Sequence, residues 1–162
     1  MTENSCAELP DRRFRPQEEN EMQISPYVNF NGDCAEAFKF YEKALGGQLV
    51  FMMTWGEMPG GKDEFPPEVQ KQIMHATLKV GEQIIMGADA PPDRYHAPEG
   101  MNVSLQVKDK AEGERLFNAL AENGKVNMPF SETFWSPGFG MCVDRFGIPW
   151  MVNTESPNPL GT

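Results

Sequence analysis

One pattern of strand, helix and further strands occurs twice along the chain. Asp33 and Asp109, which stand before the two predicted helices, are 76 residues apart, and the glycines that end these helices, Gly46 and Gly124, are 78 residues apart. Such a nearly constant spacing indicates an internal duplication, which limits the folds that the chain can adopt. Each copy has the order βαβββ. We therefore predict an α+β fold in which two tandem βαβββ modules form a curved mixed sheet around a cleft.

The first module is predicted to span about residues 23–90. A turn at residues 31–33 precedes a helix over 35–45, and Asp33 is the expected helix cap. Residues 54–72 form a long loop rich in glycine and proline. Loops of this length usually have a function, so we expect a dimer contact or a lid there. The strands of this module are expected at residues 24–30, 49–53, 75–80 and 83–87.

The second module is predicted to span about residues 100–155. Its helix lies between Asp109 and Gly124, because apolar residues recur there at helical spacing. Residues 1–22 are polar and have no periodic pattern, so they are predicted to be a flexible arm, and residues 156–162 a C-terminal tail. The strands of this module are expected at residues 102–107, 125–130, 139–143 and 149–153.

The chain is acidic, with 24 acidic and 14 basic side chains and a net charge of −10. This charge argues against nucleic acids and anionic membranes as partners, and it is compatible with a cationic ligand. Three cysteines without a paired framework fit a reducing compartment. The first residues have no apolar signal-peptide core, and no run of residues reaches the length of a membrane span. We therefore expect a cytoplasmic protein.

Five segments carry motifs of a known family. They are PYVNFNGDCAEAFKFYEKALGG (26–47), MMTWGEMP (52–59), MHATLKVGEQIIMGAD (74–89), MNVSLQVKD (101–109) and FWSPGFGMCVDRFGIPWMVNT (134–154). Together they resemble the vicinal oxygen chelate superfamily, which includes glyoxalase I, extradiol dioxygenases, and the bleomycin and fosfomycin resistance proteins. The similarity is greatest to its PhnB-like branch. The resemblance implies two βαβββ modules around a cleft and a homodimer.

Proteins of this branch often bear the name 3-demethylubiquinone-9 3-methyltransferase. A methyltransferase of the usual kind needs a glycine-rich loop between a strand and a helix for its nucleotide cofactor. The glycines of this chain, at 60–61 and 138–140, stand in a different context. We therefore do not expect methyl transfer.

The resemblance also implies positions for a metal ion. Superfamily enzymes typically hold one divalent ion with four His or Glu side chains from the first and last strands of each module, and the ion acts as a Lewis acid on two vicinal oxygens. Carried over to this chain, the positions are Pro26, Asn102, Met151 and one of residues 85–87. None of these side chains is a good ligand for a divalent ion. We therefore predict no metal and no cofactor at the usual place.

His75 is the candidate for a divergent metal site. Together with one or two of the carboxylates of Glu57, Glu82 and Asp89, it would suit zinc, manganese or iron. This arrangement is the alternative hypothesis, a metal-dependent lyase, isomerase or dioxygenase. A lone histidine is more often a hydrogen-bonded structural residue. The second histidine, His96, lies in a proline-rich loop and is expected to be exposed.

Five residues are candidates for ligand binding. Trp55 and Trp135 stand at loop edges, where rigid aromatic side chains hold flat or cationic organic ligands, although packing or dimer contacts are the other interpretation. Asn102, Ser104 and Asn153 are predicted on strands that face the cleft, and asparagine is unfavourable in strands without a further reason. The main hypothesis is a protein that binds a small organic molecule in a metal-free cleft, similar to bleomycin resistance proteins.

Overall fold

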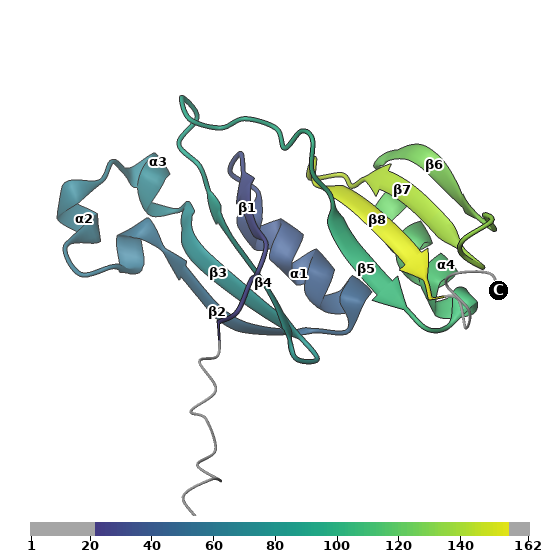
Figure 1. The fold of residues 1–162 in the computed structure, drawn as a ribbon. Coiled ribbons are helices and arrows are strands. Elements are labelled where there is room, and N and C mark those ends of the chain that lie inside the picture. Colours follow the sequence, from purple (N-terminus) through teal and green to yellow (C-terminus); the bar gives the residue numbers. More distant parts are fainter. Residues whose placement is uncertain (1–21, 156–162) are drawn as a thin grey trace, which may run out of the picture.

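The computed structural model describes residues 22–155, in which two four-stranded sheets each pack against one long helix (Figure 1). Apart from Met22, the predicted arm and the predicted tail lie outside the described residues. No helix in residues 22–155 is long and apolar enough to cross a membrane. The predicted α+β fold is confirmed.

The first module has four strands and one long helix. They are β1 (Tyr27–Phe30), α1 (Cys34–Leu45), β2 (Gln48–Thr54), β3 (Ile73–Val80) and β4 (Gln83–Asp89). The strand order in the sheet is β1-β4-β3-β2. β1 runs parallel to β4, whereas β3 is antiparallel to both of its neighbours. Parallel strands need a long connection, and the one between β1 and β4 contains α1.

The second module repeats this topology. Its elements are β5 (Val103–Val107), α4 (Lys110–Ala121), β6 (Lys125–Ser131), β7 (Phe139–Val143) and β8 (Pro149–Thr154). The strand order is β5-β8-β7-β6, and β5 is parallel to β8. The two tandem βαβββ modules are therefore confirmed. The strands form two separate mixed sheets of four strands that lie side by side, with α2 and α3 at one end of the molecule and β6 and β7 at the other (Figure 1).

Each sheet has one face against its helix and one open face. On β1, Val28 and Phe30 are buried, whereas Tyr27 and Asn29 are exposed. Successive side chains of a strand point to opposite sides of the sheet, so this alternation separates a core face from a face available to other molecules. β8 shows the same alternation, with Trp150 in the core.

The buried faces of both sheets merge into one core. Tyr41 of α1 links the modules, because its hydroxyl donates a 2.6 Å hydrogen bond to Asp144, and its ring lies 5.3 Å from that of Trp150. The buried carboxylate of Asp144 also accepts from the indole N–H of Trp150 and from the backbone N–H groups of Phe146 and Ile148. Burial and the neighbouring Asp144 raise the pKa of Tyr41, so it remains a donor.

The predicted loop over 54–72 contains short helices instead of irregular chain. They are the 3-10 helix η1 (Trp55–Glu57), α2 (Gly61–Glu64) and α3 (Pro67–Gln70). Thr54 and Glu57 form a capping box, in which the Glu57 carboxylate accepts from the Thr54 backbone N–H at 2.8 Å. Gly61 packs so closely that a Cβ there would collide with the backbone carbonyl of Trp55. Helices of three or four residues produce no periodic pattern, which is why the sequence did not predict them.

The start of α1 has an unpredicted cap. α1 begins at Cys34, and Asp33 stands at its N-cap position as predicted, but the Asp33 side chain makes no capping hydrogen bond. Asp89 of β4 takes this role, because its carboxylate accepts from the backbone N–H groups of Gly32 and Cys34 at 3.0 Å and of Ile73 at 2.8 Å. A distant strand therefore supplies the cap that the sequence assigns to the adjacent aspartate.

Candidate functional site

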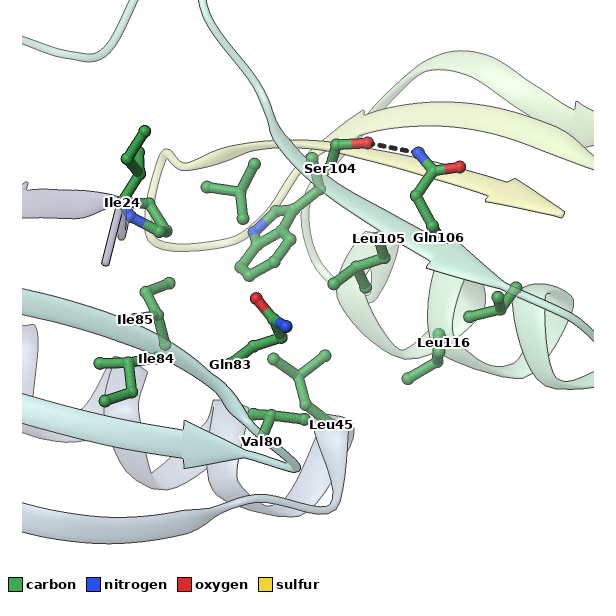
Figure 2. A pocket seen from close by; sticks show the side chains of 14 residues that line it. Ile24, Leu45, Val80, Gln83, Ile84, Ile85, Ser104, Leu105, Gln106 and Leu116 are labelled. Atoms are coloured by element: carbon green, nitrogen blue, oxygen red, sulfur yellow. Dashed lines mark hydrogen bonds between the residues drawn. The ribbon is translucent and has the colours of Figure 1, made fainter. Parts of the chain in front are cut away.

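A cavity of about 510 Å³ lies where the two modules meet (Figure 2). We call it the junction cavity. It is bounded by β4 and the end of α1 on one side, and by β5 and α4 on the other. Its wall is mainly apolar and includes Leu45, Val80, Ile85, Val103, Leu105 and Leu116. Small-molecule sites are typically about 300–1,000 Å³ and mainly apolar, so the junction cavity has the size and lining of such a site.

A few polar side chains border the junction cavity. The carboxamide of Gln83 points into the space between the modules (Figure 2). Ser104 and Gln106 of β5 stand at its edge, but their side chains lie on the face of the strand opposite Leu105, where Gln106 Nε2 donates to Ser104 Oγ at 2.8 Å (Figure 2). The lining contains no charged side chain. The overall negative charge of the chain therefore does not select the charge of a ligand in this cavity.

The polar side chains continue from β5 onto β8. Asn153 Nδ2 donates to Gln106 Oε1 at 2.8 Å, so Ser104, Gln106 and Asn153 form one hydrogen-bonded polar row. Asn153 Oδ1 is buried and has no partner among the described residues. Buried polar atoms are rarely left unpaired, so this oxygen is a place where an O–H or N–H group of a ligand would gain a partner.

The five predicted ligand residues fall into separate places. Ser104 and Asn153 are joined through Gln106, and Asn102 is exposed immediately before β5. Trp55 packs on Phe65 in the segment of short helices.

Trp135 packs instead on Phe134 and Phe139 in the second module, with ring centroids 4.6 and 5.5 Å from its own. Trp135 belongs to the connection between β6 and β7, and Trp55 begins η1, which precedes α2. β6 and β7 lie at one end of the molecule and α2 at the other (Figure 1). The structure therefore does not bring the two tryptophans into one site of a single chain.

His75 lies on the open face of the first sheet, and both of its ring nitrogens have partners. Nδ1 is 3.2 Å from the hydroxyl of Tyr27, and Nε2 is 3.0 Å from the hydroxyl of Thr77. The rings of Tyr27 and His75 stack with centroids 5.6 Å apart. In this arrangement His75 is a hydrogen-bonded residue that joins two hydroxyl groups, and it has no free nitrogen for a metal ion.

The carboxylates predicted as partners of His75 have other contacts. Glu57 caps η1, Asp89 accepts three backbone N–H groups, and Glu82 pairs with Lys79 in the β3–β4 turn. Within residues 22–155, no three His, Cys, Asp or Glu side chains form a group that could hold a metal ion. His96 is exposed, as predicted.

The positions implied for the superfamily's divalent ion hold unsuitable donors. Met86 and Met151 stand on the last strand of each module, paired with Tyr27 and Ser104 respectively. Pro26 precedes β1 and contributes only its backbone carbonyl, which accepts from the Met86 N–H at 3.0 Å. Divalent ions such as Mn²⁺ and Zn²⁺ favour carboxylate or imidazole ligands over thioethers. These residues therefore do not fit the usual ion.

The two described cysteines are buried. Burial and nearby aspartates raise the pKa of both thiols, to about 11 for Cys142, with Asp144 as its charged neighbour. Because the thiolate is the reactive form, neither side chain is suited to nucleophilic chemistry at neutral pH.

Sequence reasoning missed the residues that make the junction cavity. Gln106 had a detectable signal, because it stands two residues after Ser104 and so shares its face of the strand. Gln83 and the aliphatic lining had none, since an apolar residue beside a cavity follows the same pattern as an apolar residue in the core.

Comparisons with known proteins agree with this fold. The model of the glyoxalase/bleomycin resistance protein/dioxygenase superfamily matches residues 23–152. Protein YjdN of Escherichia coli (strain K12) is 37% identical in an alignment of 145 residues that covers 85% of this chain and 99% of that protein. The crystal structure of protein PA1353 from Pseudomonas aeruginosa is 49% identical, with a TM-score of 0.76, and the match covers 83% of this chain and 98% of that one.

The PhnB protein from Bacillus cereus is a further structural neighbour. It has a TM-score of 0.69 at 23% identity, over 82% of this chain and 99% of that one, which shows a shared fold. From its duplicated βαβββ modules and these matches, the chain belongs to the glyoxalase/bleomycin resistance protein/dioxygenase superfamily.

Proposed function

We propose that this protein binds a small, mainly apolar organic molecule in the junction cavity, without the superfamily's usual metal ion. The observation that carries the proposal is a cavity of about 510 Å³ whose apolar wall is interrupted by a few polar groups. Apolar surface supplies most of the binding free energy in such sites, and a few placed polar groups fix the orientation of the ligand.

The polar groups set the expected chemistry of the ligand. Gln83 points into the space between the modules and offers an uncharged donor and an uncharged acceptor, so a ligand with a hydroxyl, carbonyl or amide group would gain a partner there. A cytoplasmic location is part of the proposal and is supported by the odd number of cysteines.

The donors present favour binding over metal chemistry. Both nitrogens of His75 contact hydroxyl groups, and the positions that the resemblance implies for ion ligands, Met151 and one of residues 85–87, hold no imidazole or carboxylate. A metal-dependent lyase, isomerase or dioxygenase would need imidazole or carboxylate ligands that converge on one point.

A fluorescent aromatic compound, anilinonaphthalene sulfonate, serves as the probe for the junction cavity. Gln83→Trp places a large ring at the mouth of the cavity and should weaken probe binding by about tenfold or more, because a steric cost above about 1.4 kcal/mol is tenfold in affinity. Gln48→Trp, on an exposed strand position away from the cavity, is the matched control. Equal probe affinity of both variants would show that the cavity is not the binding site.

We also propose a homodimer. Large apolar side chains are exposed on the outer strands and on the β6–β7 connection, including Val50, Phe51, Phe134 and Trp135. Exposed apolar patches of this kind mark interaction surfaces, and a second copy of the chain is the partner that we expect. Sedimentation at micromolar concentration tests this, and a monomeric mass would refute it.

A further inference from the structure

Three methionines form a row across neighbouring strands of the second sheet. Met141 of β7 pairs with Met151 of β8 on one side and with Met128 of β6 on the other. All three side chains are half-buried. We call Met128, Met141 and Met151 the methionine row.

The methionine row lies on the open face of the sheet. Cys142 and Trp150, the neighbours of Met141 and Met151 along their strands, belong to the core. Because side chains alternate, Met141 and Met151 point away from the core. Met128 stands between two irregularities of β6 and pairs directly with Met141, which puts it on the same face.

The spacing of the row allows its sulfur atoms to meet. Residues directly opposite each other on adjacent strands have Cβ atoms about 4.5–5.5 Å apart. Methionine is unbranched and has three rotatable bonds, so Met128 and Met151 can direct their thioethers over the central Met141. Trp135 and Phe139 form an aromatic pair beside this face, and aromatic rings attract cations.

Thioethers are soft ligands that select Cu(I) over hard and borderline divalent ions. Met151 is unsuitable at the position implied for the superfamily's divalent ion, yet it is one of three thioethers that can meet. We propose that the methionine row is a binding site for a soft monovalent metal ion of the Cu(I) type. None of the three methionines lines the junction cavity, although Met151 pairs with Ser104 at its edge, and this proposal does not rest on the proposed small-molecule function.

Ag(I), which has the coordination preferences of Cu(I) without its redox chemistry, is the probe. The experiment uses the full chain with Cys6→Ser, because a cysteine thiol also binds Ag(I), and with ¹³C-labelled methionine methyl groups. We expect one Ag(I) per chain by calorimetry and a shift of the Met128, Met141 and Met151 methyl signals. Mn²⁺ at the same concentration should leave these signals in place.

Leucine variants test whether the row itself binds the ion. Met141→Leu keeps the volume of the side chain, so the fold should be retained. It should weaken Ag(I) binding by at least about tenfold, because mutation even of residues that only support metal ligands lowers metal affinity by that factor. Met151→Leu provides the same test if the central variant unfolds. Met53→Leu is the matched control, because Met53 is half-buried on the other sheet and pairs with His75.

Several outcomes would overturn the proposal. They are an absence of Ag(I) binding, unchanged affinity in both Met141→Leu and Met151→Leu, and methyl shifts that disappear when Cys142→Ala is added to the background. Loss of probe binding in Gln83→Trp concerns the junction cavity alone, so the two proposals can fail separately.

Discussion

The two modules share a topology, but the side chains at the ends of their last strands differ in type and in hydrogen bonding. Asp89 and Thr154 occupy equivalent places, opposite Phe30 and Val107 at the ends of the first strands. Asp89 accepts three backbone N–H groups, whereas Thr154 Oγ1 is buried without a partner among the described residues. In the second module, the hydroxyl of Ser136 instead contacts the end of β8, because it donates to the Thr154 carbonyl at 2.7 Å. A duplicated backbone therefore does not require duplicated polar contacts.

The same difference applies to the helix starts. α4 has a local cap, because the Asp109 carboxylate accepts from the backbone N–H of Glu112 at 3.0 Å. α1 depends on Asp89, which lies 55 residues after the Cys34 N–H that it binds. The start of the first helix is therefore a tertiary contact, and the start of the second is set by adjacent residues.

The largest effect is expected at Asp144, which connects the modules. Asp144→Asn keeps the shape of the side chain but turns one acceptor into a donor that faces the N–H of Trp150 and the hydroxyl of Tyr41. We expect the free energy of unfolding to fall by about 3–4 kcal/mol, measured by urea denaturation. Asp93→Asn, at an exposed position, is the control. Equal stability of the two variants would contradict a role for Asp144 in joining the modules.

Asp89→Asn should have the next largest effect. Its amide N–H would face the backbone N–H of Ile73, while the remaining oxygen still accepts from Gly32 and Cys34. We expect a loss of about 2–3 kcal/mol, with faster hydrogen exchange at these three amides. Unchanged exchange at all three would mean that Asp89 does not hold the start of α1.

Removal of the side-chain cap should destabilise the chain more at α4 than at α1. Asp109→Ala removes a side-chain cap and should lower the free energy of unfolding by about 1 kcal/mol. Asp33→Ala removes no capping bond and should cost clearly less. Thermal or urea unfolding of the pair measures this, and equal losses would return the capping role to Asp33.

The smallest effect concerns pH. Burial raises the pKa of Asp33, and the neighbouring charge of Asp89 adds to this. The folded chain therefore holds this proton more tightly than the unfolded chain, so the contribution of Asp33 to stability is complete below its ordinary pKa and is lost as the pH rises through the raised value. The difference in stability between Asp33→Asn and the natural chain should therefore shift in favour of the variant when the pH rises from about 3.5 to 7. Denaturation at both values tests this, and a difference that is independent of pH would contradict it.

Most of the backbone fold was predictable from the sequence. Periodic apolar residues indicated α1 and β7 within one residue of their bounds and the start of α4, which ends at Ala121, before Gly124, because burial of one face requires that pattern. The short helices of residues 55–70 were not predictable, since they are fixed by a capping box and by the close approach of Gly61 to Trp55. β1 is shorter than predicted and begins at Tyr27.

The candidate site was less predictable. Ser104 and Asn153 were identified from their unusual place on strands, and they belong to one polar row. Trp55 and Trp135 were chosen for their chemistry, but the fold separates them, because position along the chain says little about distance in space.

The sequence by itself determined the duplication, the superfamily and the unsuitable donors at the implied metal positions, because each of these depends on residue identity and spacing along the chain. The tertiary structure decided which distant groups meet. Tyr41 and Asp144 are 103 residues apart yet form a 2.6 Å hydrogen bond, and the junction cavity exists only because the two modules pack in one orientation. Periodicity indicates which face of a helix or strand is buried, but it does not indicate which other element packs against that face.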